Sequence, residues 1–202
     1  MELCRHAWVK KDGISTGLSW ERKVTSVSRA RLVLQDAMHV RQKLEDETSA
    51  LEWRLGWVLA VVLLRAVGHV LAKVDGDADP AVASVVKVCF TEWKSGAEHS
   101  IFQDFIEKER NSILKEYNAG ITEGSVDVMT AVQSSCGFQF TSHASLEDNI
   151  YRPLTDGPFA GEDGRTILDY AIDWWVAQLA EVDRQVVSLR QASRGPGRSS
   201  SD

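Results

Sequence analysis

The sequence predicts an all-α protein built as an antiparallel helical bundle of about five helices. Apolar residues recur at spacings of three and four over five stretches, which is the pattern of helices with one buried face. Short polar segments carrying helix-start and helix-stop residues separate most of these stretches. Of the 202 residues, 44% are hydrophobic, enough to form a core. We therefore expect one bundle domain over 26–191, an irregular N-terminal arm over 1–25 and a disordered tail over 192–202.

The first two helices are predicted from their apolar faces and from a capping motif. The first helix covers about 26–47, with an apolar face formed by Val27, Ala30, Leu34, Ala37, Met38 and Leu44. Ser49 and Glu52 have the spacing of a capping box, which predicts a second helix over about 50–74. Gly76 directly follows Asp75, and this pair is expected to break that helix.

Two further start signals predict the third and fourth helices. Asp79 is suited to cap a helix whose first position is Pro80. Ser100 and Gln103 repeat the spacing of a capping box and predict a fourth helix over about 101–118. The apolar face of this fourth helix should comprise Phe102, Phe105, Ile106, Ile113, Leu114 and Tyr117.

The segment 121–162 has a different pattern. Alternating residues predict an irregular region or a small β-hairpin insertion, with a short helix as the alternative. The alternating positions are Val126, Val128, Thr130 and Val132, followed by Phe138 and Phe140. A last helix is predicted over about 164–191, where apolar residues keep helical spacing for almost seven turns.

Charge and cysteine content limit the class of function. The net charge is −6, although the first 31 residues hold seven Lys and Arg against three Asp and Glu. An acidic body is a poor general binder of nucleic acid, because phosphate contacts need clustered Lys and Arg, but a local basic site stays open. The three cysteines are far apart and odd in number, so we expect no disulfide framework and a reducing compartment.

One apolar stretch, 55–72, approaches the length of a membrane span. Arg65 lies inside it, and a charge at mid-span costs about 2.5–3.5 kcal/mol on insertion scales. His69 adds a second polar group. We interpret the stretch as the central helix of a soluble bundle. No apolar signal segment is visible at the N-terminus, so a cytoplasmic location is expected.

Neither a metal nor another cofactor is expected. The histidines lack zinc-ligand spacing, and no glycine-rich phosphate loop is present. The stretch that begins at Asp75 starts like a calcium loop, but Pro80 and Val86 stand where glycine and glutamate are required. Asp169 and Asp173 lie one helical turn apart, and we interpret them as part of a solvated face.

A polar stripe runs along the predicted second helix. Arg65, His69 and Lys73 are spaced by four and share one side of the most apolar helix. A buried arginine needs an anionic or carbonyl partner. One interpretation is a structural ion pair between Arg65 and Glu107 or Glu109, and the other is a polar pocket.

The most informative motif is in the fourth predicted helix. Arg110, Asn111, Lys115 and Tyr117 form the pattern R-N-x(3)-K-x-Y over residues 110–117. This pattern resembles the HEPN family of helical bundles, whose version reads R-N-x-x-x-H-x-Y. Lys115 stands where the family has histidine. Because lysine is normally protonated, it can attract phosphate but lacks the lone pair of a base.

The resemblance implies a phosphate- or RNA-binding cleft across a homodimer, in a defence or toxin–antitoxin setting. Arg110 would bind a phosphate, Asn111 and Tyr117 would orient it, and Lys115 would add charge. The implied enzyme is a weak or inactive, metal-independent endoribonuclease. Arg65 and His69 would support the cleft, and His69 could replace the missing base within hydrogen-bond reach.

The alternative is a non-enzymatic module for protein–protein interaction. Clustered tryptophans often anchor interfaces, and the candidates are Trp53, Trp57, Trp174 and Trp175. The same residues may equally belong to the core. A homodimer is expected in either case. An open cleft joining Arg110, Lys115 and Arg65 would favour the HEPN-like function, whereas an Arg110 neutralised by a local Glu would favour the interaction module.

Overall fold

The computed structural model describes residues 26–122, 126–133, 139–146 and 151–193, and most of these are helical. The principal helices are α1 (Ser28–Lys43), α2 (Ala50–Val70), α4 (Pro80–Ser95), α5 (Lys108–Glu116) and α6 (Gly164–Ser193). Shorter turns connect them, namely the π-helices η1 (Leu71–Asp75) and η3 (Ile101–Glu107), helix α3 (Gly76–Ala78) and the 3-10 turn η2 (Ala97–His99). The fold is therefore predominantly helical, as predicted.

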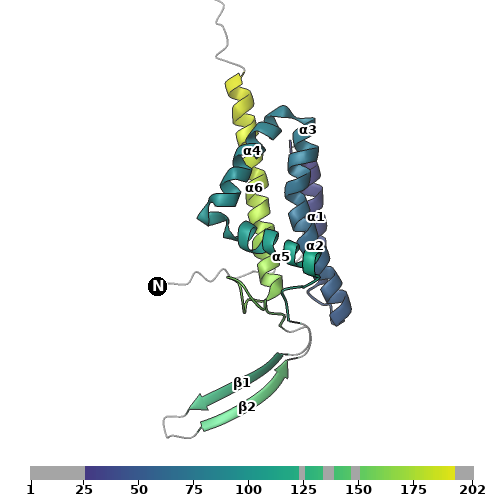
Figure 1. Ribbon diagram of the computed structural model, residues 1–202, viewed down its shortest axis with the longest axis vertical. Coiled ribbons are helices and arrows are strands. Elements are labelled where there is room, and N and C mark those ends of the chain that lie inside the picture. The colour runs from purple at the N-terminus through teal and green to yellow at the C-terminus, as the bar shows by residue number, and fades with distance from the viewer. Residues whose placement is uncertain (1–25, 123–125, 134–138, 147–150, 194–202) are drawn as a thin grey trace, which may run out of the picture.

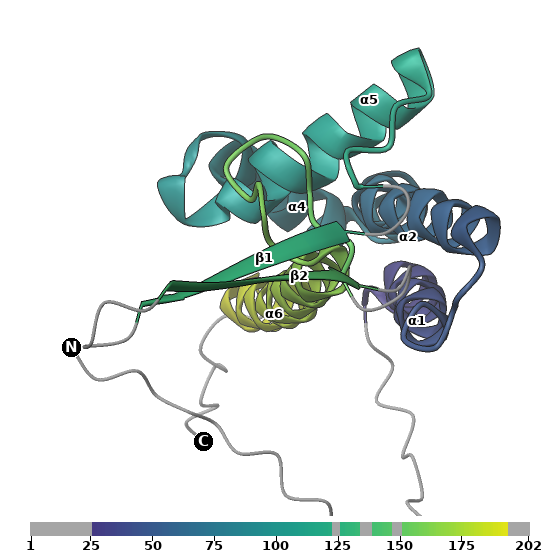
Figure 2. The ribbon, with the colours of Figure 1, turned by 90° about the horizontal axis from the view of Figure 1, so that it is seen from below.

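The long helices lie side by side (Figure 1). Helix α6 packs against α1, α2 and α4, and α1 packs along α2. Helix α5 contacts η3 and α2, and seen from below its far end extends away from the other helices (Figure 2). Helix α6 continues to Ser193, two residues into the segment predicted to be a disordered tail. The predicted arm, 1–25, and residues 194–202 lie outside the described residues.

The segment between α5 and α6 contains two paired strands. Strand β1 (Val126–Gln133) pairs antiparallel with β2 (Gln139–Leu146), in a register that joins Val128 to Ala144. The pair projects away from the helices (Figure 1). At its base, Ile121 forms a bridge with Leu154. Residues 134–138, which connect the two strands, lie outside the described residues.

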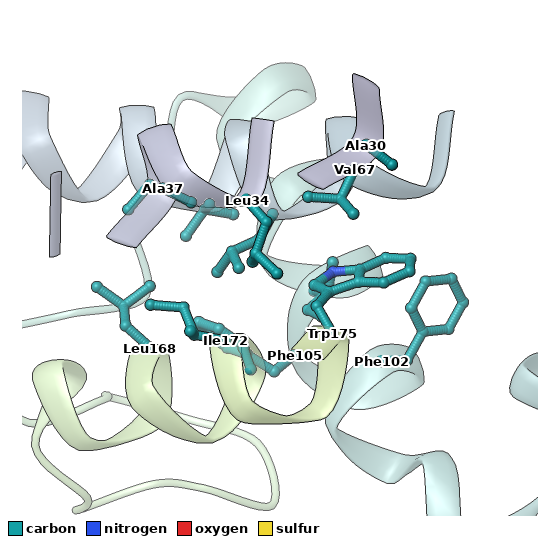
Figure 3. Packing of buried hydrophobic residues seen from close by; sticks show 14 of the residues in the cluster. Ala30, Leu34, Ala37, Val67, Phe102, Phe105, Leu168, Ile172 and Trp175 are labelled. Atoms are coloured by element: carbon teal, nitrogen blue, oxygen red, sulfur yellow. The ribbon is translucent and has the colours of Figure 1, made fainter. Parts of the chain in front are cut away.

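The core is formed where α1, α2, η3 and α6 meet (Figure 3). Ala30, Leu34 and Ala37 are buried on the face of α1 that the sequence predicts. They face buried residues of the other helices, which include Val67, Phe102, Phe105, Leu168, Ile172 and Trp175. Small residues on α1 allow the bulky residues of α6 and η3 to approach, so large and small side chains interlock.

The five tryptophans within the described residues belong to this core or pack against it. Trp53, Trp57, Trp93 and Trp175 are almost completely buried, and Trp174 is half-buried. Trp93 packs edge-on against Trp174 and Trp175, with ring centroids 5.4 Å apart in both pairs. These five tryptophans therefore stabilise the packing of the helices in the described part of the chain.

The expected helix break at Asp75–Gly76 is wrong. Gly76 has helical backbone angles (φ −67°), and the helix that begins at Ala50 continues through η1 and α3 to Ala78. Asp75 is 4% exposed and its carboxylate accepts hydrogen bonds from the backbone N–H groups of Arg29 and Ala30. The Asp75 side chain is thus occupied in capping α1 and is not free to end its own helix.

Two of the three predicted start signals are confirmed. Ser49 accepts a hydrogen bond from the N–H of Glu52 at 3.3 Å, and Asp79 accepts one from Ala81 at 3.0 Å. The Ser49 N–H itself donates to Glu47, so only the serine half of the first capping box forms. Ser100, in contrast, makes no capping hydrogen bond. Its expected partner, Gln103, donates to the carbonyl oxygens at the end of α4 instead. The second capping box is therefore wrong, because Gln103 closes the preceding helix.

Three residues expected on apolar faces are exposed. Met38 is 45% exposed, Leu114 56% and Tyr117 69%. The motif helix ends at Glu116, and Tyr117 follows it in the left-handed conformation (φ 52°). The spacing of seven implied that Tyr117 and Arg110 share one face of a helix. Because the helix ends before Tyr117, the two residues do not share a helical face.

One helical run among the described residues, Ala50–Ala78, is long and apolar enough to cross a membrane by length and composition. The core helices of soluble proteins can pass the same test. Trp53, Trp57 and Leu64 in this run are completely buried against other helices. Of the most apolar window of the run, 39% is buried, so one side of the helix forms core and the other side is open.

Candidate functional site

Helix α5, which carries the Arg110 motif, lies against α2. Glu109 and Ile113 form its buried face, and Arg110 and Asn111 are half-buried beside them. Lys115 points into solvent. The amphipathic spacing of the sequence thus turns Arg110 toward the edge of the helix contact and Lys115 away from it.

Arg110 interacts with its neighbour in the motif. Its Nη1 donates a hydrogen bond of 2.9 Å to Oδ1 of Asn111. Within the described residues Arg110 forms no ion pair, so the local neutralisation by Glu that would favour the interaction module is not observed there. The guanidinium keeps donors available for an anion.

None of the four motif residues lines the cavity beside α5. That cavity lies between α5, η3 and the loop before α6, and its lining on α5 comprises Lys108, Glu109 and Ser112. Arg110 and Lys115 are not part of this lining. Tyr117 lies beyond the helix end. The motif therefore presents a half-buried arginine and an exposed lysine at the surface of α5.

Arg65 is engaged in a structural contact. Its Nη2 lies 3.5 Å from Oε1 of Glu107, and its guanidinium lies 5.9 Å from the centre of the Phe102 ring. The ion-pair interpretation is thus confirmed, with Glu107 as the partner. Both side chains are nearly 30% exposed, so the pair contributes less than about 1 kcal/mol.

His69 lies exposed one turn beyond Arg65 on α2. Helix α5 meets α2 at Trp57, through Glu109, and His69 is twelve residues further along α2. Twelve residues span about 18 Å of helix axis. The structure therefore places His69 far along α2 from the level of Arg110.

The cavity beside α5 contains a buried carboxyl group that sequence analysis did not identify as a site. Glu109 is 9% exposed, and its Oε1 accepts hydrogen bonds from Trp57 Nε1 at 3.0 Å and from the Gly120 N–H at 2.7 Å. Burial raises the pKa of the Glu109 carboxyl, the two hydrogen bonds oppose this shift, and the nearby charge of Asp156 adds to it. One signal in the sequence was available, because Glu109 lies four residues before Ile113 on the apolar face.

Close approach of the chain at Gly120 holds this group in place. A Cβ atom at position 120 would lie 2.6 Å from Oε2 of Glu109, which is closer than real contacts allow. Glycine therefore lets the backbone N–H reach the carboxylate. The cavity has a volume of about 140 Å³ and mixed walls, lined by Asp104, Phe105, Lys108, Glu109, Ser112, Asn118, Gly120, Leu154, Asp156, Gly157, Pro158 and Phe159.

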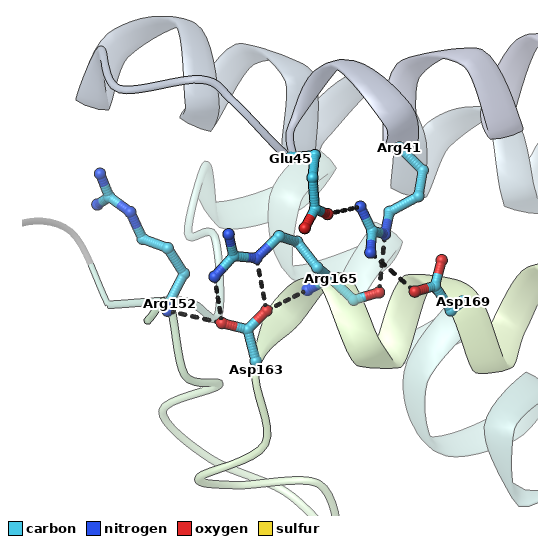
Figure 4. Close-up of polar contacts among 6 residues, drawn as sticks. All are labelled: Arg41, Glu45, Arg152, Asp163, Arg165 and Asp169. Carbon is cyan, nitrogen blue, oxygen red and sulfur yellow. Dashed lines mark hydrogen bonds and ion pairs between the residues drawn. The ribbon is translucent and has the colours of Figure 1, made fainter. Parts of the chain in front are cut away.

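A polar network joins α1 to the start of α6 (Figure 4). Arg41 donates to Asp169 at 2.8 Å, to Glu45 at 2.8 Å and to the carbonyl oxygen of Arg165 at 3.0 Å. Asp163 lies below this network and bonds Arg165 through both carboxylate oxygens. Among the described residues no group of three or more His, Cys, Asp and Glu side chains is placed to hold a metal ion.

The outer side of α2 carries an exposed leucine stripe, defined as Leu51, Leu55 and Leu59, which are 52%, 45% and 48% exposed. Leu55 and Leu59 line a groove of about 240 Å³ between α1 and α2. Gly56 forms part of its floor, and Lys43, Glu47 and Glu52 lie among its charged residues. We refer to this feature as the α1–α2 groove. Sequence analysis missed it because the whole helix was assigned to the core.

Comparison with known protein families, curated proteins and solved structures finds no match to this chain.

Proposed function

We propose that this chain is a helical protein–protein interaction module that self-associates through the α1–α2 groove. The supporting observation is the leucine stripe, which leaves three large apolar side chains about half exposed on a helix whose other side forms the core. Exposed apolar residues gathered in one patch are typical of binding surfaces, whereas isolated ones are common on any protein.

A second copy of this chain is the partner whose chemistry fits the groove. Its lining carries both signs of charge, from Lys43 on α1 and from Glu47 and Glu52. A two-fold axis places the same patch on both sides of an interface, so a patch with both signs can pair with itself. Apolar residues at i, i+4 and i+8 are also the pattern of one helix lying along another.

Sedimentation analysis of the purified chain tests this proposal. We expect a dimer in the wild type and a monomer in Leu55→Glu, because a charge at the centre of the stripe would be buried without a partner. Val88→Glu is the matched control, since Val88 is 56% exposed on α4 and outside the groove. A monomeric wild type, or equal dimerisation of Leu55→Glu and wild type, would contradict the proposal.

A second candidate function is binding of RNA or another phosphate ligand by a HEPN-like surface on α5. It is favoured by Arg110, which is half-buried, held by Asn111 and without an ion pair among the described residues. Lys115 adds positive charge one turn further on. Weak endoribonuclease activity without a metal is the corresponding enzymatic proposal, and the absence of a histidine at 115 limits it.

Incubation of total RNA with wild type and with Arg110→Ala tests this second candidate. If the surface acts on RNA, the wild type either cleaves the RNA or slows its migration in a gel. Arg110→Ala should do so at least tenfold less, and the control Lys87→Ala on α4 should behave as wild type. If neither wild type nor Arg110→Ala detectably cleaved or bound RNA, the second candidate function would be contradicted.

We propose that β1 and β2 form a stable hairpin insertion in solution, and cross-strand nuclear Overhauser effects between Val128 and Ala144 would test the register.

We also propose a cytoplasmic location, supported by Cys89, a free and buried thiol. Labelling of thiols in denatured protein taken from cells, before any reduction, would test it.

A further inference from the structure

The cavity beside α5 contains a negative charge that the helix packing does not require. Both hydrogen bonds to Glu109, from Trp57 and from Gly120, end on Oε1. A glutamine could accept the same two bonds through its amide oxygen without burying a charge. Among the described residues no cation forms an ion pair with Glu109, and no donor reaches Oε2. The side chain is 9% exposed, and its Oε2 atom has no protein donor among the described residues but is not sealed from solvent, so a ligand in the cavity can reach it.

The polar groups around this carboxyl group add to its negative charge. Asp104 and Asp156 line the same cavity. The one ammonium group in the lining, that of Lys108, is engaged by Asp104 at 2.5 Å. Burial and the charge of Asp156 both raise the pKa of Glu109, so a bound cation would oppose both effects. The chemistry of these groups favours a positively charged ligand.

The remaining walls limit the size and shape of that ligand. Phe105, Leu154 and Phe159 line the same cavity and offer apolar contacts. The volume of about 140 Å³ is close to the ~150 Å³ in which an apolar cavity can hold a benzene-sized molecule. A ligand of this size has one charged head and a short hydrocarbon stem. Aromatic faces attract such cations as well as their apolar stems.

We propose that this cavity binds a small primary alkylammonium ion. The ammonium group donates to Oε2 of Glu109 and faces Asp156, and the alkyl stem packs against Phe105 and Phe159. The proposal is independent of self-association through the α1–α2 groove, which shares no lining residue with this cavity.

Titration with n-butylammonium chloride, followed by the indole N–H resonance of Trp57 in NMR spectra, tests the proposal. This indole donates to Glu109 and therefore reports on the charge of that carboxyl group. We expect a saturable shift in the wild type and at least tenfold weaker binding in Glu109→Gln, which preserves both hydrogen bonds. Asp169→Asn, an acidic residue of α6 outside the cavity, should bind as wild type. Sodium chloride holds the ionic strength constant.

A neutral ligand and a second variant complete the design. n-Butanol has the same stem without the charge and should give no saturable shift. Asp156→Asn should weaken binding several-fold while leaving the Trp57–Glu109 bond intact, which provides a test if Glu109→Gln fails to fold. A response to butanol equal to that for the amine, an unsaturable shift in wild type, or equal affinity in wild type and Asp156→Asn would overturn the proposal.

Discussion

The carboxylate of Asp75 accepts a 2.9 Å hydrogen bond from the backbone N–H of Ala30, 45 residues earlier in the chain. A second bond, of 3.1 Å, reaches it from the N–H of Arg29. Helix α1 begins at Val27–Ser28 without a side-chain cap of its own. The end of one helical run thus satisfies the free N–H groups at the start of another.

Replacing this cap should destabilise the fold. We expect Asp75→Ala to lower the free energy of unfolding by about 1–2 kcal/mol, because two buried N–H groups lose their acceptor. Urea denaturation measures the change. Asp77→Ala, two residues further on and exposed, should stay within about 0.5 kcal/mol of wild type. Equal losses in the two variants would contradict the capping role.

Gly68 lies at the closest approach between α2 and two aromatic side chains. A Cβ at this position would lie 2.9 Å from Trp175 and 3.1 Å from Phe90. We expect Gly68→Ala to lower the unfolding free energy by about 1–3 kcal/mol through overpacking, despite the better helix propensity of alanine. Thermal denaturation is a suitable measurement.

Gly56→Ala on the same helix provides the comparison. Its Cβ would meet only the flexible end of Leu44, at 2.7 Å. A rotation of that side chain relieves the contact, and alanine gains about 1 kcal/mol of helix propensity. Gly56→Ala should therefore cost less than Gly68→Ala. A larger loss for Gly56→Ala than for Gly68→Ala would show that Trp175 and Phe90 pack loosely enough against Gly68 to accept a methyl group.

Stability should depend on pH through Glu109. Its pKa is raised above the ordinary 4.5 in the folded state, mainly by burial, so the folded protein binds this proton more tightly than the unfolded chain does. The corresponding stabilisation is complete below the unfolded pKa and is lost as the pH rises through the folded pKa. We therefore expect the stability of Glu109→Gln relative to wild type to increase with pH and then level off.

Urea denaturation of both proteins between pH 4 and pH 8 checks this sign. Glu116→Gln on the exposed end of α5 is the control, and its difference from wild type should change little with pH. A Glu109→Gln difference that falls as the pH rises would mean that a hidden cation stabilises the carboxylate.

Arg41 should contribute more to stability than its ion pair with Asp169 alone. The Arg41 side chain is 15% exposed and also donates to the carbonyl oxygen of Arg165, whereas Asp169 is 51% exposed. We expect Asp169→Asn to cost less than about 1 kcal/mol. Arg41→Met should cost about 1–3 kcal/mol, because a partly buried carbonyl group loses its donor. Denaturation of each variant in urea separates the two, and equal losses would assign the whole effect to the ion pair.

Local rules predicted much of the helical fold. Ser49 and Asp79 act within their own first turn, so residues a few positions away specify the cap. The periodic faces of α1 and α6 are likewise local. The predicted residues Ala30 and Leu34 of α1 are buried, and so is Leu168 on the apolar face of α6.

The differences arise where a distant segment competes for a side chain. Asp75 followed by Gly76 has the local pattern of a helix end, but the first turn of α1 occupies the carboxylate. Gln103 is drawn to the carbonyl groups that end α4. Such partners lie outside any local window of sequence, so the pattern alone could not predict them.

The site residues show the same limit. The spacing of Arg110 and Tyr117 assumes a helix that continues, whereas the chain turns left-handed at Tyr117. Arg65 was expected to pair with Glu107 or Glu109, and only the packing of α5 on α2 decides between them. That same packing buries Glu109, which follows the apolar spacing of its helix and was not recognised as a site.

The π-helical turn η1 fixes which way Asp75 faces. Each residue of an ordinary helix rotates the chain by about 100°, so deleting one residue such as Ala72 would swing this carboxylate away from α1 by roughly that angle. The apolar residues before the turn would keep their places, while everything after it would present a different side. Deleting a single residue here would therefore break the contact between Asp75 and the start of α1, although nearly every side chain involved would still be present.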